Sequence, residues 1–270
     1  MDSRRKARVD LVVPCLNEAH VIEKSVETIR DFLKRTDFPY QWKVIVADNG
    51  SKDGTADRAR ALAAKYPDEV GLISLDVRGR GRALREAWSR STADVVAYTD
   101  VDLSTELEAL VKLCRAILDE GYDLGTGSRL LPESRTTRGP KREFISRCYN
   151  RLVKLVLWTS FSDAQCGFKA VSRRVVDEVM PQVLDQSWFF DTELLVLSEK
   201  QGYRIKDLPV KWVDDDDSRV KILKTAWDDI KGVVRLRLHL FSSAFRAKKA
   251  AALAKHREKY GGSGAHRTGI

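Results

Sequence analysis

Two aspartates follow an apolar run near the middle of the chain. Residues 95–99 have the composition of a buried β-strand, and Asp100 and Asp102 come directly after it. A strand packed on both faces is a near-continuous apolar run, and ligands of open α/β sheets bind outside the carboxyl ends of such strands. If strand geometry persists, both carboxylates point to one side and could share Mg²⁺ or Mn²⁺, which prefer oxygen ligands. The spacing alone leaves a second interpretation open, in which the aspartates cap the following helix.

The elements that would position these carboxylates alternate along the first half of the chain. Apolar runs predict strands at residues 9–13, 44–47, 70–75 and 95–99, and helical spacing predicts helices at 18–34, 55–65, 80–90 and 106–118. Such alternation indicates parallel βαβ units with right-handed crossovers, an architecture that typically binds a nucleotide. We therefore expect an α/β fold, a Rossmann-like and mostly parallel sheet flanked by helices.

The second half predicts a less regular completion of the same sheet. Strands are expected at 123–127, 166–171 and 203–213, helices at 144–161 and 192–200, and a polar loop at 135–142. The helix at 144–161 is expected to carry its apolar residues on one broad face, and Trp188 is expected in the core. The predicted domains are a catalytic domain at 1–217, a basic amphipathic helical segment at 218–260 and a disordered tail at 261–270.

The composition is that of an ordinary globular protein, and the positive charge is concentrated in one segment. The 270 residues are 43% hydrophobic, which suffices for a packed core. The four cysteines show no pairing pattern and no zinc-ligand spacing, so a reducing compartment is expected. The net charge is +9, and residues 218–260 alone hold 12 Lys or Arg against 3 Asp or Glu. The basicity is therefore local.

This basic segment carries an apolar stripe at helical spacing, which has two main interpretations. The stripe could pack on the core as in an ordinary surface helix. It could instead lie in a membrane interface, with the cations toward anionic headgroups. Nucleic acid is not expected as a partner, because no basic groove with interleaved aromatics is evident. No window reaches the roughly 20 apolar residues of a membrane span, and no signal-peptide pattern is present, so membrane contact is expected to be peripheral or monotopic.

Three ordered motifs resemble one enzyme family. They are VVPCLNE at 12–18, ADNGSKDGT at 47–55 and the two aspartates at 100–102, and further matches are GSR at 127–129, DAQCGFK at 163–169, FDTEL at 190–194 and residues 212–219. Together they resemble the inverting family 2 glycosyltransferases of the GT-A fold. The resemblance covers about residues 8–220 and is closest to the branch of dolichyl-phosphate glucosyltransferase and dolichol-phosphate mannose synthase.

The resemblance implies a donor site at the strand ends. It assigns the nucleotide to Pro14, Asn17, Glu18 and Asp48, the metal (Mg²⁺ or Mn²⁺) to Asp100 and Asp102, and the diphosphate to Arg219. The basic run at 78–82 could place Arg80 and backbone N–H groups near the diphosphate as well, and a solvated basic turn is the equal alternative interpretation. The metal would offset the charge of the departing nucleoside diphosphate. We assign Asn49 no role, and we expect residues 51–55 to form a turn with a helix cap rather than a binding loop.

The resemblance also implies the residues around the sugar and the acceptor. Asp163 and Gln165 resemble the pair near the reacting sugar, and Asp191 and Glu193 resemble the carboxylates near the acceptor. The chemistry of a phosphate acceptor adds three candidates, Arg129, Arg142 and Arg147. The three arginines would grip an acceptor phosphate, because guanidinium matches phosphate bidentately. Surface charge is the alternative interpretation for them, as a turn cap is for Asp163. Since a phosphate monoester is largely ionised near neutral pH, no strong general base is needed.

These observations predict an inverting hexosyltransferase at the cytoplasmic face of a membrane. The donor would be a nucleotide diphosphate sugar, UDP-glucose or GDP-mannose, and the acceptor a polyprenyl or dolichyl phosphate. The alternatives are a glycosyltransferase with a soluble or polysaccharide acceptor, a nucleotidyltransferase, and an inert membrane-bound scaffold that retains the fold. The motif at 165–169 favours UDP-glucose.

Overall fold

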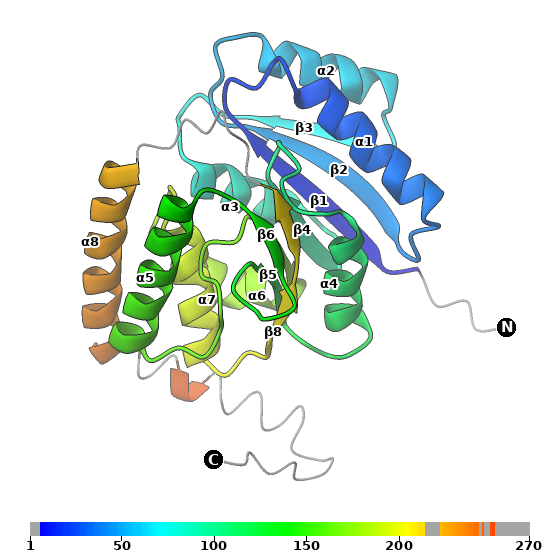
Figure 1. The fold of residues 1–270 in the computed structure, drawn as a ribbon. Helices are drawn as coiled ribbons and strands as arrows, with labels where there is room; N and C mark the ends of the chain where they lie inside the picture. The colour runs from blue at the N-terminus through cyan, green and yellow to red at the C-terminus, as the bar shows by residue number, and fades with distance from the viewer. Residues whose placement is uncertain (1–5, 214–221, 243–244, 246–248, 252–270) are drawn as a thin grey trace, which may run out of the picture.

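The computed structural model describes residues 6–213, 222–242, 245 and 249–251. Seven strands form one sheet in the order β3-β2-β1-β4-β7-β5-β8, which lies between two layers of helices (Figure 1). The sheet explains the long apolar runs of the sequence, because central strands are covered on both faces. Its strands are β1 (Arg8–Cys15), β2 (Gln41–Asp48), β3 (Val70–Ser74), β4 (Val95–Thr99), β5 (Leu124–Ser128), β7 (Phe168–Ser172) and β8 (Ile205–Pro209).

Helices cover both faces of this sheet. One layer holds α1 (Ile22–Arg35), α2 (Thr55–Lys65) and α4 (Glu108–Leu118). The opposite layer holds α3 (Arg80–Arg90), α5 (Pro140–Leu157), α6 (Arg173–Glu178), α7 (Phe190–Lys200) and α8 (Ile222–Phe241), with the short helix η1 (Met180–Gln182). Strand side chains alternate between the two cores, since Leu11 and Val13 face the first layer and Val12 faces the second. A separate two-stranded sheet pairs β6 (Arg135–Thr137) with β9 (Lys211–Val213).

Strand β7 breaks the parallel pattern and shapes the functional edge. It runs antiparallel to both of its neighbours, β4 and β5, and its first residue, Phe168, is paired with Thr99. The turn at 163–167, which precedes β7, therefore lies at the carboxyl end of β4. Strand β5 is antiparallel to β7 as well, so it ends at the same edge of the sheet.

The predicted fold class is confirmed, and most predicted elements are present, but three local predictions are wrong. The expected loop at 135–142 contains β6 and the first turn of α5, because Pro140 fixes a helical start at its first position. The apolar residues of α5 lie on two faces, since Val153 is buried whereas Leu155 is 75% exposed. Trp188 is 42% exposed and outside the core.

The described residues include only part of the predicted segments at 218–260 and 261–270. The described part of the basic segment is α8, together with residues 242, 245 and 249–251. The expected tail at 261–270 and the expected diphosphate ligand Arg219 lie outside the described residues. Within the described part of the chain, no helix is long and apolar enough to cross a membrane.

Candidate active site

The carboxyl ends of β1 and β2 hold the expected nucleotide residues. Asp48 ends β2 and is 1% exposed. Its Oδ1 accepts the backbone N–H of Ser51 at 3.3 Å, and its Oδ2 accepts the hydroxyl of Ser74, at the end of β3, at 3.1 Å. These contacts fix the carboxylate in place at the sheet edge, next to Pro14 of β1, whose strand partner is Ala47.

The turn after β1 is tied to the turn after β2. Asn17 has a positive φ of 57°, its backbone N–H donates to Ser51 Oγ at 2.8 Å, and its Oδ1 accepts the backbone N–H of Lys52 at 2.9 Å. The backbone N–H of Glu18 donates to Thr55 Oγ1 at 2.9 Å. Residues 51–55 thus form the expected turn, although Gly54, the N-cap residue of α2, provides no side-chain cap. The turn holds Asn17 and Glu18 at the strand ends.

Arg80 joins two carboxylates at the end of β4. Its guanidinium lies 2.6 Å from Asp100 Oδ1 and 2.6 Å from Asp191 Oδ2, and its side chain is only 10% exposed. The same guanidinium stacks over the rings of Tyr98 and Trp188, with centroids 4.9 and 5.1 Å away. Two acids, one cation and two aromatic rings therefore form a compact charged cluster at the sheet edge.

Three residues at this cluster were not predicted as site residues, namely Tyr98, Trp188 and a second cation, Lys169. Lys169 is fully buried, and its Nζ lies 2.6 Å from the carbonyl oxygen of Cys166 and 3.2 Å from Asp191 Oδ1. The Tyr98 hydroxyl donates to the same Asp191 oxygen. Burial would raise the pKa of Asp191, but Lys169 and Arg80 outweigh it and lower that pKa. The sequence signal that could have identified Lys169 is its position in an otherwise apolar strand, because a buried cation needs anionic partners.

A second buried ion pair lies on the other side of β7. Arg129 donates through Nε and Nη2 to both oxygens of Asp163, at 2.7 and 2.9 Å, and its guanidinium stacks over the Trp212 ring. Asp163 is fully buried. Burial would raise the pKa of Asp163, but the Arg129 guanidinium more than offsets this and lowers that pKa to about 2. The structure thus brings together two residues expected at the sugar and the acceptor.

Asp100 and Asp102, the expected metal ligands, lie at the carboxyl end of β4, where Asp100 Oδ1 is paired with Arg80. Gly167 packs so closely on Asp100 that an added Cβ would lie 1.7 Å from Oδ2, which keeps this carboxylate beside bare backbone. Asp102 is exposed, and its Oδ1 accepts the backbone N–H of Ser104 at 3.0 Å, so it also caps the turn. Among the described residues no group of three His, Cys, Asp or Glu could hold a metal. Mg²⁺ commonly uses one or two carboxylates together with substrate phosphates.

The expected acceptor residues lie in two different settings. Arg142 and Arg147 are on α5, where Arg147 Nε donates to Glu143 at 2.5 Å. Glu193 is 2% exposed and accepts the backbone N–H groups of Leu184 and Asp185 at 3.1 and 2.8 Å. Burial raises the pKa of Glu193. These contacts make Glu193 a support for the loop that precedes α7.

Gln165 is the expected sugar-side residue that contacts α8. Its backbone N–H donates to Asp163 Oδ1 at 3.2 Å, and its Nε2 donates to Asp229 Oδ2 of α8 at 2.8 Å. The residue is partly exposed. It therefore links the turn at 163–167 to the last described helix of the chain.

The family follows from comparison with known proteins. The sequence profile of glycosyl transferase family 2 matches residues 10–180. The chain belongs to glycosyl transferase family 2. Among curated relatives, Glycosyltransferase AglD of Haloferax volcanii is 38% identical over 220 residues, which are 80% of this chain and 35% of AglD. A dolichyl-phosphate beta-glucosyltransferase of Trichomonas vaginalis is 29% identical over 243 residues, 86% of this chain and 72% of the relative.

Solved structures show the GT-A fold of this family 2 chain. Glucosyl-3-phosphoglycerate synthase from Mycobacterium tuberculosis in complex with uridine-diphosphate has a TM-score of 0.65 and 20% identity, covering 86% of this chain and 80% of that one. A further structure of that synthase contains Mn²⁺, uridine-diphosphate and glucosyl-3-phosphoglycerate. The chain spans 35% of AglD, so the activity of AglD as a whole does not by itself define the activity of this chain.

In this family 2 chain, the structure shows a contact of Asn49 that the sequence did not predict. Asn49, to which the sequence assigned no role, accepts the backbone N–H of Gly79 at 2.5 Å through its Oδ1. This contact holds the backbone immediately before Arg80, where Gly79 has a φ of 151°. An added Cβ on Gly79 would lie 2.5 Å from the carbonyl oxygen of Gln186. Asn49 therefore helps to set the start of α3 and the direction of Arg80.

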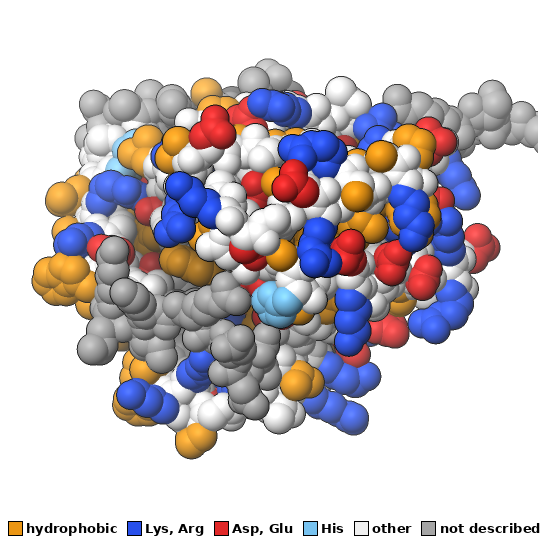
Figure 2. Space-filling view, turned by 90° about the horizontal axis from the view of Figure 1, so that it is seen from above, with side chains coloured by type: hydrophobic (Ala, Val, Ile, Leu, Met, Phe, Trp, Pro, Cys, Tyr) orange, Lys and Arg blue, Asp and Glu red, His pale blue; other side chains and the backbone are white. Residues whose placement is uncertain are grey.

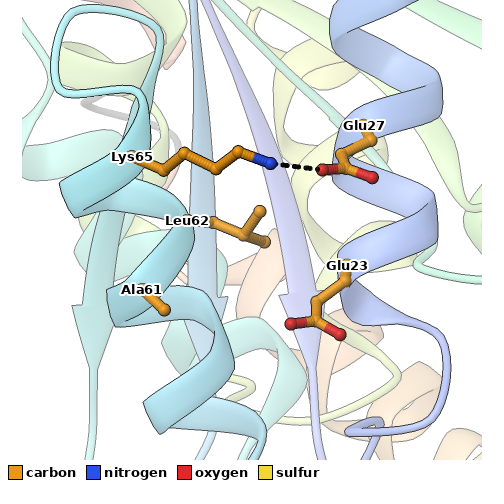
Figure 3. Close-up of a pocket in the computed structure, with 5 residues that line it drawn as sticks. All are labelled: Glu23, Glu27, Ala61, Leu62 and Lys65. Atoms are coloured by element: carbon orange, nitrogen blue, oxygen red, sulfur yellow. Dashed lines mark hydrogen bonds and ion pairs between the residues drawn. The ribbon is translucent and has the colours of Figure 1, made fainter.

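Hollows elsewhere on the surface do not coincide with this site. One lies between α1 and α2 and is lined by Glu23, Glu27, Ala61, Leu62 and Lys65 (Figure 3). The Lys65 ammonium crosses it to Glu27 at 3.2 Å, as in an ordinary surface ion pair. None of the expected site residues lines it. The strand-end cluster is a better candidate because its charges are buried and converge.

Proposed function

We propose that the chain transfers glucose from UDP-glucose to a polyprenyl or dolichyl phosphate, with inversion, at the cytoplasmic face of a membrane. The observation that carries this proposal is the charged cluster at the end of β4, where Arg80 joins Asp100 to Asp191 at 2.6 Å each. The relative named dolichyl-phosphate beta-glucosyltransferase supports the sugar and the acceptor. The four cysteines are free, which suits a reducing compartment.

In the proposed donor site, each group has a physical task. Asp48 and the turn at 17–18 would bind the nucleoside, since fixed carboxylate and amide oxygens suit its N–H and hydroxyl donors. Asp100 and Asp102 would hold Mg²⁺ or Mn²⁺, which supplies positive charge against the leaving diphosphate. Arg80 lies within hydrogen-bond distance of Asp100 and would add a further cation beside the diphosphate.

The buried acids near the sugar suit an acceptor that is already ionised. Arg129 lowers the pKa of Asp163 to about 2 against the effect of burial, so this carboxylate is an anion near neutral pH and a poor proton acceptor. Lys169 and Arg80 lower the pKa of Asp191 in the same way. A phosphate monoester needs no strong base, so positioning and charge neutralisation would dominate. In this proposal Arg129, Arg142 and Arg147 serve the acceptor phosphate, and Gln165 lies beside the sugar.

A product assay separates this function from its alternatives. The full chain is incubated with Mg²⁺ and labelled UDP-glucose or GDP-mannose, together with dolichyl phosphate in vesicles or soluble sugars. We expect lipid-linked glucose and released UDP from the pair of UDP-glucose and dolichyl phosphate. Product on a soluble sugar alone, pyrophosphate release, or nucleotide binding without turnover would each point to one of the alternatives and contradict the proposal.

The outer helices offer a surface for the membrane. On α8 the exposed apolar side chains are Trp227, Ile230, Val234, Leu238 and Phe241, and on α5 and its end they are Phe144, Leu155 and Trp158. The Arg237 guanidinium stacks between the rings of Trp158 and Phe241, with centroids at 3.8 and 4.4 Å. Figure 2 shows hydrophobic side chains at the left edge, on the side where Figure 1 places α8. Such a mixture of apolar and cationic groups suits an anionic lipid interface.

Vesicle binding should depend on this surface. We expect the triple substitution Trp227→Ser, Leu238→Ser and Phe241→Ser to lower the fraction bound to anionic vesicles at least tenfold, because each large apolar side chain contributes about 1.5–3 kcal/mol when buried. Co-sedimentation with phosphatidylserine vesicles measures this fraction. The control is Val77→Ser, which removes an apolar side chain of 53% exposure from a loop after β3. Equal binding of the triple variant and the wild type would rule this surface out.

A further inference from the structure

The turn at 163–167 is held by the two helices that carry the proposed membrane surface. The backbone N–H of Ala164 donates to Asn150 Oδ1 of α5 at 2.8 Å. The Gln165 Nε2 donates to Asp229 Oδ2 of α8 at 2.8 Å. Asn150 is 5% exposed and Asp229 is 4% exposed, although both belong to helices with exposed outer faces. Each of these helices therefore reaches the active-site turn through one buried polar side chain.

Asp229 is an unusual residue at its position. A buried carboxylate is costly unless it is hydrogen-bonded. Burial, with smaller contributions from the carboxylates of Asp185 and Asp228, raises the pKa of Asp229 to about 6, although the hydrogen bond from Gln165 acts in the opposite direction. Packing of α8 does not require a carboxylate there, since an apolar side chain would fill the same space without this cost. The hydrogen bond from Gln165 offers a reason for a carboxylate at this position.

We propose that Asp229 is a positioning residue, whose carboxylate fixes the Gln165 amide beside the reacting sugar and makes turnover depend on the seating of α8. This inference rests on the proposed function, which places Gln165 at the sugar. Fixing Nε2 on Asp229 leaves Oε1 as the end of the amide that can accept a sugar hydroxyl. A residue held in the reactive geometry contributes through orientation, and a misplacement of about 1 Å can cost about a hundredfold in rate.

Other contacts show that α8 is seated closely against the site. Arg235 Nη2 lies 2.9 Å from Glu193 Oε2, and Glu193 in turn holds the loop before α7. Gly232 lies against Phe189, so that an added Cβ would come within 2.6 Å of that ring. A movement of α8 away from the sheet would break the Asp229 contact together with these two. The helix that would meet the lipid is thereby connected to the Gln165 amide.

The test compares two substitutions at Asp229 with a matched one beside it. Asp229→Ala removes the acceptor for Nε2, whereas Asp229→Asn retains an amide oxygen that can accept the same N–H. We expect Asp229→Ala to lower kcat for glucose transfer at least tenfold with the KM for UDP-glucose changed less than twofold. Asp229→Asn should recover kcat to within about threefold of the wild type. The control Asp228→Ala, at a side chain of 56% exposure, should behave as the wild type.

Two outcomes would overturn the inference. An Asp229→Ala protein with the kcat of the wild type would show that the contact is dispensable. An Asp229→Asn protein as impaired as Asp229→Ala would show that the charge of Asp229 matters rather than its hydrogen bond. If Asp229→Ala does not fold, Asp229→Leu, which has a similar shape and no acceptor, takes its place. A circular dichroism melt of each variant identifies misfolding.

A signal that does not require activity separates this inference from the proposed function. In the ¹⁵N-labelled full chain, the Gln165 side-chain amide is assigned by its loss in Gln165→Met. We expect its protons to exchange slowly in the wild type and in Asp229→Asn, and at least tenfold faster in Asp229→Ala. If the wild type transferred no glucose, the proposed function would be wrong. The exchange rates of the Gln165 amide protons would still show whether Asp229 holds this side chain. Equal exchange in wild type and Asp229→Ala would overturn the positioning whatever the activity.

Discussion

Replacing Asp102 with alanine should lower glucose transfer by about a thousandfold, because a cation at a leaving diphosphate contributes several kcal/mol to the transition state. Asp102 is exposed, and its contact with the Ser104 backbone is a local turn contact, so the fold should persist. Turnover is measured with UDP-glucose and dolichyl phosphate at saturating Mg²⁺. Calorimetric titration of Mn²⁺ in the presence of UDP measures the loss of metal affinity directly.

The matched control for this substitution is Glu108→Ala. Glu108 is also exposed, lies six residues further along the same segment, and is in the first turn of α4. It should keep both turnover and Mn²⁺ affinity. In the wild type, EDTA should remove activity, and added Mg²⁺ or Mn²⁺ should restore it. Full activity of Asp102→Ala, or activity that survives EDTA, would contradict the metal assignment.

Replacing Arg129 with methionine should destabilise the protein by about 3–5 kcal/mol at pH 7, because it leaves the fully buried Asp163 without its bidentate partner. Methionine keeps much of the length and packing of the side chain over the Trp212 ring. Urea unfolding of the wild type and the variant measures the change. Removing one partner of a buried ion pair is among the point substitutions that lower the free energy of unfolding most.

The pH dependence of this difference follows from the sign of the pKa shift. In the wild type Arg129 lowers the pKa of Asp163 to about 2, below its unfolded value, so the pair stabilises above pH ~4 and is lost as the pH falls toward 2. In Arg129→Met the buried carboxyl group loses its cation, its pKa rises, and the variant becomes relatively more stable as the pH falls. We expect the gap between the two proteins to be widest at pH 7 and narrower at pH 4.5.

A double variant separates the unpaired charge from lost packing. Arg129→Met with Asp163→Asn removes both charges and should recover at least half of the lost stability, because replacing both partners of a buried pair is far less costly than replacing one. Destabilisation of Arg129→Met that is the same at both pH values, and no recovery in the double variant, would show that packing on Trp212 is the dominant contribution. The role of Arg129 at the acceptor phosphate is separate and remains a proposal.

The position of the candidate residues at the strand ends was accessible from the sequence because it depends on local order. An apolar run followed by Asp100 and Asp102 indicates both a strand and the position of its carboxyl end. In a parallel sheet such ends meet at one edge. Asp48 was assigned from the family resemblance, and the structure places it at the end of β2. Lys169 and Tyr98 were missed, since their role depends on Asp191 of α7, whose contact with β7 no short-range pattern records.

The sequence by itself determined the fold class, the family resemblance and the edge of the sheet at which the candidate site residues lie, because these depend on apolar periodicity and on short motifs. Only the tertiary structure decided that β7 runs antiparallel, which brings Gly167 against Asp100 and places the turn at 163–167 beside β4. It also decided that α8 reaches Gln165 through Asp229, 64 residues away along the chain. The physical reason is that strand direction and long-range side-chain pairing are set by packing across the whole core, which local spacing does not encode.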